Sequence, residues 1–180
     1  MKTKNASPMR QLVLAALFLA LAFVLPLLTG QVPKVGNMLC PLHFPVLLCG
    51  FVLGGPWGLA VGFAAPLLRS VLFGMPPMFP IAVSMAFELA AYGLISGLLY
   101  RRLPKNAAGV YASLAGAMVG GRMVWGAVRA LITLASPTPF GLAIFWTEAV
   151  LNAIPGILLQ LVLIPALVLS LQRARLSPVQ

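Results

Sequence analysis

Successive apolar runs, separated by short stretches rich in proline, glycine and basic residues, make up most of the chain. A membrane-crossing helix needs about 20 apolar residues, so the chain can hold about six such helices with short connections. Little length remains for a soluble domain. We therefore expect one all-α integral membrane domain, residues 1–180, with six transmembrane helices near residues 11–28, 42–53, 57–73, 81–100, 110–134 and 144–171.

The composition supports the membrane class, because 61% of the residues are hydrophobic and only 8% are charged. The formal net charge of +10 is compatible with nucleic-acid binding, but the basic residues flank the apolar runs. This distribution follows the positive-inside rule and places both termini and the 101–105 loop in the cytoplasm, in contact with lipid headgroups. We expect no nucleic-acid partner. The flanking residues are Lys2, Lys4, Arg10, Arg101, Arg102, Lys105, Arg173 and Arg175.

Two arginines, Arg122 and Arg129, lie inside the apolar run 110–134. A charge at the middle of a membrane helix costs about 2.5–3.5 kcal/mol, so such residues are usually functional. Because they are seven residues apart, they share one helical face about 10 Å from each other, with Trp125 between them. We interpret this face as one wall of a charged, aromatic-lined cavity within the bundle.

The sequence contains two acidic residues, Glu88 and Glu148, and both fall within apolar runs. On the expected topology most of the exceptional polar and aromatic residues lie in the outer half of the membrane or in the outer loops, and Arg122 lies deeper. This grouping predicts a binding site that opens to the exterior beneath the loops. The outer residues are Lys34, His43, Arg69, Glu88, Arg129, Trp146, Glu148 and Asn152.

Structural roles explain some of these residues equally well. Arg129 with Glu148, or Arg69 with Glu88, could simply hold helices together. Arg69 and Lys34 could reach lipid headgroups, and His43 could be an ordinary hydrogen-bonded residue. The cations nevertheless outnumber the glutamates, and an unpaired buried cation is costly. A ligand carboxylate or phosphate, or a water-filled cavity, would balance the excess.

The usual motifs of catalysis are missing from the sequence. It contains neither a GxxxxGK[ST] phosphate loop nor an HExxH motif, and His43 has no recognisable Ser or Cys partner. Cys40 and His43 are too few ligands for a metal, and Cys40 and Cys49 are placed too far apart for a disulfide. We expect no cofactor, no metal, no catalytic residues and no enzymatic activity. Uphill transport would draw its energy from elsewhere.

The run Pro45–Pro56, the following Gly58-Leu-Ala-Val-Gly62 and the alanines of residues 11–28 resemble the substrate-binding S components of energy-coupling factor (ECF) vitamin transporters. The resemblance implies a six-helix bundle in a prokaryotic plasma membrane. Such a component captures a vitamin or related nutrient from outside. It then reorients on a membrane-embedded T subunit and two ATPase subunits.

In that family an alanine motif on the first helix docks the T subunit, and Ala16 and Ala20 match it here. The spacing alone is also compatible with ordinary helix packing. The excess of cations favours a small anionic ligand that carries a carboxylate, such as a pantothenate-like nutrient. Stacking on Trp125 and Trp146 would point instead to a heterocyclic ligand.

Two other functions remain compatible with these residues. The first is a self-sufficient small-molecule carrier or channel, which would transport without partner subunits. The second is an intramembrane enzyme that uses Glu88, Glu148 or His43 in acid–base chemistry. Transport by the chain alone would indicate the first, and turnover of a bound ligand the second.

Overall fold

The computed structural model describes residues 7–28, 38–134, 141–149 and 151–174, and these ranges are helical without any β-strand. The predicted all-helical class is confirmed for this part of the chain. Five helical spans in it are apolar and long enough to cross a membrane, and a sixth helix, α3 (His43–Leu53), is shorter. The sequence predicted six crossing helices, so α3 is the one that falls short.

The helix bounds otherwise follow the apolar runs. The remaining helices of the first part are α1 (Pro8–Leu28), α4 (Gly55–Phe73), α5 (Val83–Arg102) and α6 (Ala107–Leu134), with a short helical turn η1 (Met78–Ala82) before α5.

The expected helix 144–171 differs from the structure, which has α7 (Leu142–Ala149), the turn η2 (Leu151–Ala153) and α8 (Ile154–Arg173). Pro155 stands in the first turn of α8, where its missing N–H leaves no helical hydrogen bond unmade. Pro155 therefore starts a helix and does not kink a continuous one.

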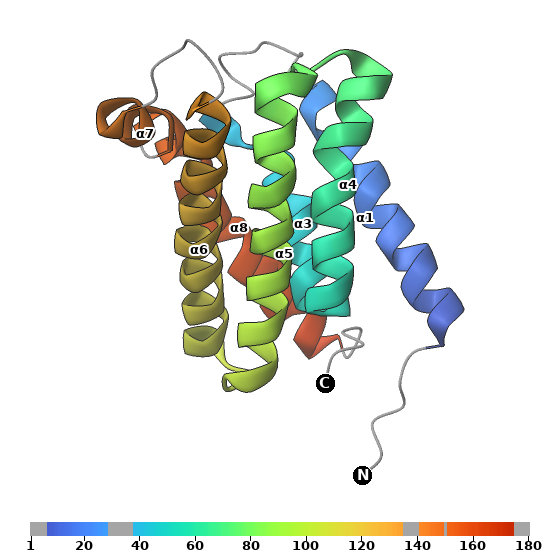
Figure 1. Ribbon diagram of the computed structural model, residues 1–180. Coiled ribbons are helices and arrows are strands. Elements are labelled where there is room, and N and C mark those ends of the chain that lie inside the picture. Colours follow the sequence, from blue (N-terminus) through green and yellow to red (C-terminus); the bar gives the residue numbers. More distant parts are fainter. Residues whose placement is uncertain (1–6, 29–37, 135–140, 150, 175–180) are drawn as a thin grey trace.

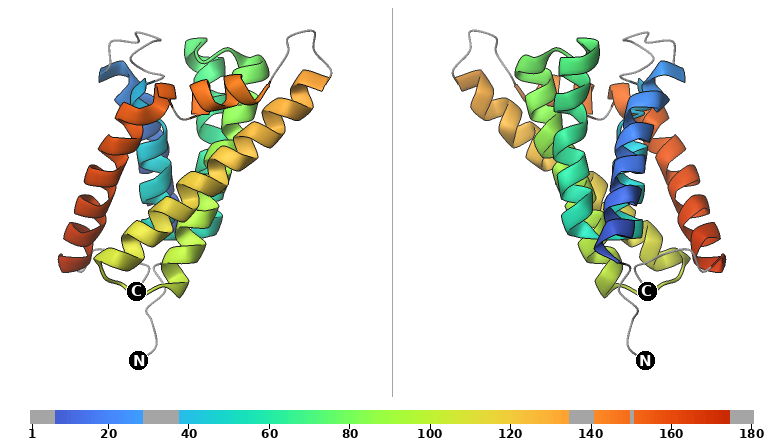
Figure 2. Two further views of the ribbon diagram at one scale, coloured as in Figure 1. Left: turned by 90° about the vertical axis from the view of Figure 1, so that its left-hand side faces the viewer. Right: turned by 90° about the vertical axis from the view of Figure 1, so that its right-hand side faces the viewer.

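The helices form one bundle with α5 near its centre, packed against α3, α4 and α6 (Figure 1). α1 begins and α8 ends at the same end of the bundle, which also holds the turn between α5 and α6, whereas α7 lies at the opposite end. α6 is inclined across the bundle relative to α5 (Figure 2).

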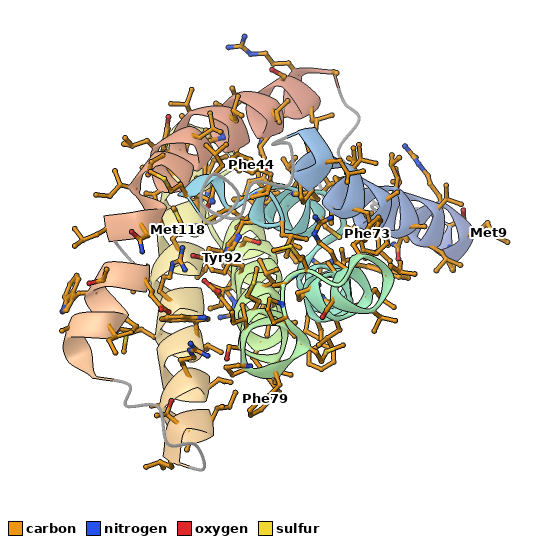
Figure 3. The ribbon with its side chains drawn as sticks, turned by 90° about the horizontal axis from the view of Figure 1, so that it is seen from above. Met9, Phe44, Phe73, Phe79, Tyr92 and Met118 are labelled. Atoms are coloured by element: carbon orange, nitrogen blue, oxygen red, sulfur yellow. The ribbon has the colours of Figure 1, made fainter. Side chains whose placement is uncertain are left out.

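Two clusters of buried apolar side chains fill the bundle, and α3 contributes to both. One cluster joins α3 to α1, α4 and α5, and the other joins it to α5, α6 and α8. Seen from above, Phe44 and Tyr92 lie among the helices, whereas Met9 and Phe79 point outward (Figure 3). The first cluster binds the first half of the bundle together, and the second lies beneath the polar residues described below.

The backbones of α4 and α5 touch along a glycine seam, which consists of Gly55, Gly58, Gly62, Gly93 and Gly97. A Cβ atom on Gly58 would lie 2.5 Å from the carbonyl oxygen of Gly93, and one on Gly93 would lie 2.2 Å from that of Gly58. No side chain fits at either position. Small residues at this spacing allow membrane helices to approach closely, and this contact fixes α5 against α4.

Candidate functional site

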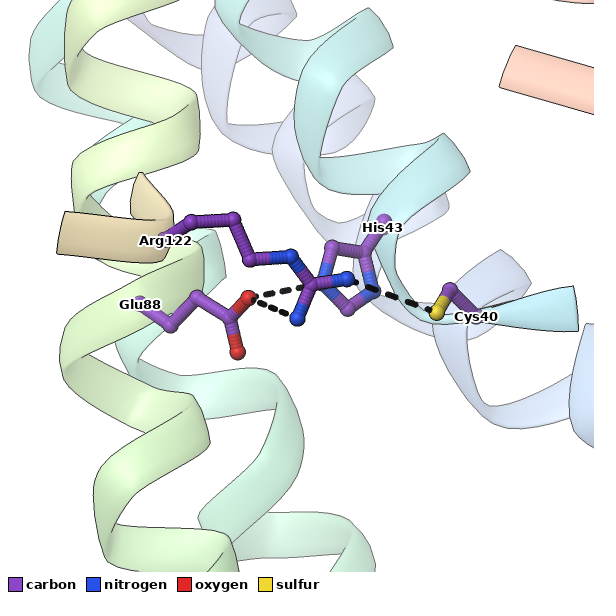
Figure 4. A network of polar contacts seen from close by, with 4 residues as sticks. All are labelled: Cys40, His43, Glu88 and Arg122. Carbon is purple, nitrogen blue, oxygen red and sulfur yellow. Dashed lines mark hydrogen bonds and ion pairs between the residues drawn. The ribbon is translucent and has the colours of Figure 1, made fainter. Parts of the chain in front are cut away.

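A buried polar cluster, composed of Cys40, His43, Glu88 and Arg122, lies between α3, α5 and α6 (Figure 4). Glu88 accepts from Arg122, with 2.8 Å between Oε1 and Nη1. The same oxygen lies 3.4 Å from His43 Nε2. The second guanidinium nitrogen, Nη2, points to the Sγ atom of Cys40 at 3.9 Å. The four residues come from three separate parts of the sequence, because Cys40 and His43 lie three residues apart.

Burial makes this cluster electrostatically important. Glu88 and His43 are 1% and 3% exposed, and the Arg122 side chain is 17% exposed. A lone charge in such surroundings would be strongly unfavourable, whereas a close, hydrogen-bonded pair is tolerated. Tyr92, one turn after Glu88 on α5, packs edge-on against His43 with 5.0 Å between the ring centroids. The cluster is therefore bounded on one side by the Tyr92 ring. The charges of Glu88 and Arg122 cancel, so the cluster has no net charge when the imidazole is neutral.

Three buried polar atoms in the described part of the chain have no hydrogen-bond partner, namely His43 Nδ1, Arg122 Nε and Gln160 Oε1. Gln160 is 1% exposed and lies on α8. One turn before it, Gly156 packs against the backbone of Met38 and Leu39, and one turn after it, Ile164 joins the core with Phe44. Because residues four apart share a helical face, Gln160 lies on the side of α8 that packs against residues 38–44.

Arg69 lies away from this cluster. Its Nη1 donates to the carbonyl oxygen of Phe23 at 3.1 Å, and its guanidinium carbon lies 5.2 Å from the centre of the Phe73 ring. The pairing of Arg69 with Glu88, considered above as a structural alternative, does not occur, because Glu88 is occupied by Arg122. In this structure Arg69 links α4 to α1.

Arg129 is half-buried two turns beyond Arg122 on α6, and Glu148 is exposed on α7. The salt bridges found among the described residues involve neither of them, so the alternative Arg129–Glu148 pair is not formed here. Asn152 in η2 and Trp146 on α7 are also exposed. Lys34 lies outside the described residues.

Aromatic contacts attach α7 to α6. Trp125 is 7% exposed, and its ring centroid lies 6.0 Å from that of Phe145 on α7. Phe145 in turn contacts Trp146, with 6.2 Å between the centroids. Gly126 makes room for this contact, since a Cβ there would lie 2.5 Å from the Phe145 ring. Trp125 is therefore covered by α7, whereas Trp146 is open to the surroundings.

A family model described as the substrate-specific component of ECF transporters matches residues 10–168, which is most of the chain. The chain belongs to this family. The resemblance seen in the sequence is thereby confirmed. Searches among curated proteins and among solved structures each found no match.

As a substrate-specific component, or S component, the chain is a multi-pass membrane protein of a transport system. It works with the T and ATPase subunits of an ECF transporter to take up a small-molecule substrate. The described residues contain no group of three or more His, Cys, Asp or Glu side chains that could hold a metal ion.

The first helix of this S component presents Ala16 and Ala20 on an exposed face, while Ala15, Phe18 and Ala22 on its other face are buried in the bundle. The described bundle therefore does not use the Ala16–Ala20 pair for its own packing. The small-residue face is available to a partner in the membrane.

Sequence reasoning identified Glu88, Arg122 and His43 but missed two neighbours. Cys40 was considered only as a metal or disulfide residue, although it lies just three residues before His43. Gln160 is a polar residue within the apolar run of α8, and that isolation was the available signal. Neither residue belongs to a motif that a single sequence reveals.

Proposed function

We propose that this S component captures a small water-soluble vitamin or related nutrient with high affinity outside a prokaryotic cell. Delivery to the cytoplasm then requires the T subunit and two ATPase subunits. The observation that carries the proposal is the polar cluster, which leaves hydrogen-bonding atoms buried and unpaired inside a bundle of a substrate-binding family. Such atoms are costly unless a ligand completes them.

The distribution of charge supports the orientation. Basic residues lie at the end where α1 begins and α5 and α8 end, namely Arg10, Arg101, Arg102, Lys105 and Arg173. This end is the cytoplasmic one by the positive-inside rule. The polar cluster lies toward the opposite end, because His43 begins α3 there and Glu88 follows soon after the start of α5. A ligand would reach it from outside.

The proposed ligand carries a carboxylate that binds Arg129. Arg122 is neutralised by Glu88 and Arg69 is held by Phe23, so Arg129 is the half-buried guanidinium in the described bundle that remains for an anion. A guanidinium can hold a carboxylate through two parallel hydrogen bonds. A pantothenate-like molecule would also supply hydroxyl groups for Glu148 and Asn152, and we propose Trp125 and Trp146 as its aromatic neighbours.

We assign Ala16 and Ala20 to the contact with the T subunit. Their exposure on α1 and the absence of bulky side chains at both positions support a close helix–helix contact. This assignment separates the docking surface on α1 from the ligand site between α3, α5 and α6.

Purification of the chain followed by mass spectrometry of co-purified small molecules tests the proposal. We expect a carboxylate-bearing nutrient that rebinds tightly, and liposomes containing the chain alone should not accumulate it. Accumulation on adding the T and ATPase subunits with ATP completes the test. ATP-independent uptake by the chain alone would show a self-sufficient carrier, and chemical conversion of the molecule would show an enzyme.

A further inference from the structure

The polar cluster is poorly suited to an anion, although it contains an arginine. Glu88 lies 2.8 Å from Arg122, so a ligand carboxylate at this place would approach a buried carboxylate of the same charge. With the imidazole neutral, it would also leave the buried cluster with a net negative charge, which is costly in the membrane interior. The cluster and Arg129 must therefore recognise different parts of a ligand.

The unpaired atoms define what the cluster can recognise. His43 faces the Glu88 carboxylate with Nε2, and the tautomer that donates from Nε2 carries an acceptor lone pair on the unpaired Nδ1. Gln160 Oε1 is a second free acceptor, and Arg122 Nε is a free donor. A matching ligand group presents hydrogen-bond donors to His43 and Gln160 and an acceptor to Arg122.

We propose that the polar cluster and Gln160 bind an uncharged group of the ligand that presents a donor and an acceptor side by side, as in an amide or a ring lactam. This inference rests on the proposed function and divides the ligand into two parts. The uncharged edge lies between α3, α5, α6 and α8, and the carboxylate lies at Arg129, two helical turns along α6. Tyr92 on α5 and Trp125, three residues after Arg122 on α6, are buried aromatic side chains of this region.

Three pairs of probes that differ in one carboxylate test this division by isothermal calorimetry on the full chain in detergent. The pairs are 2-pyrrolidinone and pyroglutamate, panthenol and pantothenate, and uracil and orotate, and both members of each pair keep an amide or lactam. We expect the carboxylate-bearing member of at least one pair to bind at least tenfold more tightly than its uncharged partner. Arg129→Ala should abolish this difference and leave the uncharged member unaffected.

Gln160→Met keeps the length of the side chain and removes the amide, so it should weaken both members of the pair by about tenfold, the effect of one lost hydrogen bond to a buried group. His43→Phe keeps the ring beside Tyr92 and should act in the same direction. Gln172→Met, the same change near the other end of α8, is the control and should leave both affinities unchanged. The melting temperature of each ligand-free variant checks its folding.

Wild-type affinities in both Gln160→Met and His43→Phe would overturn the inference while leaving the proposed function intact. Loss of affinity for the carboxylate member alone in these variants would also overturn it, because the cluster would then hold the anion. Failure of all six probes to bind would overturn the inference, while nutrient capture itself is tested separately by the molecule that co-purifies with the chain.

Discussion

Glu88 connects three helices through one carboxylate, because its Oε1 atom meets both Arg122 of α6 and His43 of α3. Both partners approach from other elements, so the carboxylate acts as a common acceptor within the bundle. Its removal would leave a largely buried guanidinium without a counter-charge. The stability of the bundle around the polar cluster therefore depends strongly on this residue.

We predict that Glu88→Ala destabilises the ligand-free protein by about 3 kcal/mol, the usual cost of removing one partner of a buried ion pair. The melting temperature in detergent measures this loss. Glu148→Ala is the matched control, because that carboxylate is exposed and has no salt bridge among the described residues. Equal melting temperatures for the two variants would contradict the structural role of Glu88.

For these individual residues, the sequence showed which charged side chains lie within apolar runs but not which of them pair with each other. Helical spacing placed Arg122 and Arg129 on one face, and Glu88 is one of two acidic residues within apolar runs. It could not fix the rotation and depth of α6 against α5, and these determine that Arg122 is the residue that reaches Glu88. The partner of Arg69 is a backbone carbonyl, which no pattern of side chains could reveal.

Among the elements, α4 and α5 form the closest contact through the glycine seam. Gly93→Ala would place a Cβ atom 2.2 Å from the Gly58 carbonyl oxygen, and only a shift of one backbone can relieve the overlap. We predict a loss of about 1–3 kcal/mol in stability, as for other overpacked sites. Thermal unfolding in detergent checks this value.

Gly141→Ala is the control for the glycine seam, because a Cβ atom there meets nothing within 4 Å. Its melting temperature should match that of the wild-type protein. A Gly93→Ala variant as stable as Gly141→Ala would show that the two backbones are not held as closely as described.

The exposed face of α1 that carries Ala16 and Ala20 gives a second prediction about a single helix. Ala16→Trp or Ala20→Trp should block ATP-driven uptake in the reconstituted transporter while leaving ligand affinity within twofold of wild type, because a bulky ring prevents close approach of the T subunit. Val162→Trp, on an equally exposed part of α8, serves as the control and should transport normally. Normal uptake by both alanine variants would reject the docking role.

Element boundaries were predicted well where apolar runs were continuous, as in α4, α5 and α6. The run 144–171 was mistaken for one helix because hydropathy does not change between α7 and α8. The local signal was Pro155, which suits the first turn of a helix better than its middle. The short α7 owes its position to aromatic contacts with α6, and such contacts depend on the folded bundle.

For the whole molecule, the two ends of the bundle differ in chemistry. A cysteine that replaces Glu148 on α7 should react with a membrane-impermeant maleimide in intact cells. A cysteine that replaces Arg102 at the end of α5 should react only after the cells are opened. The wild-type protein, with Cys49 buried and Cys40 half-buried, gives the background labelling. The reverse pattern would invert the proposed orientation.

The glycine seam differs from the other helix contacts in which atoms meet there. Between α4 and α5 backbone meets backbone, whereas three glycines in the middle of α6 face the side chains of Leu99, Ile95 and Tyr92. Substitution of a side chain can therefore change the contacts of α6 gradually, whereas the backbone contact between α4 and α5 tolerates almost no substitution. A lineage built on this frame can acquire a new nutrient by altering α6 and α8, and its members should remain most alike along α4 and α5.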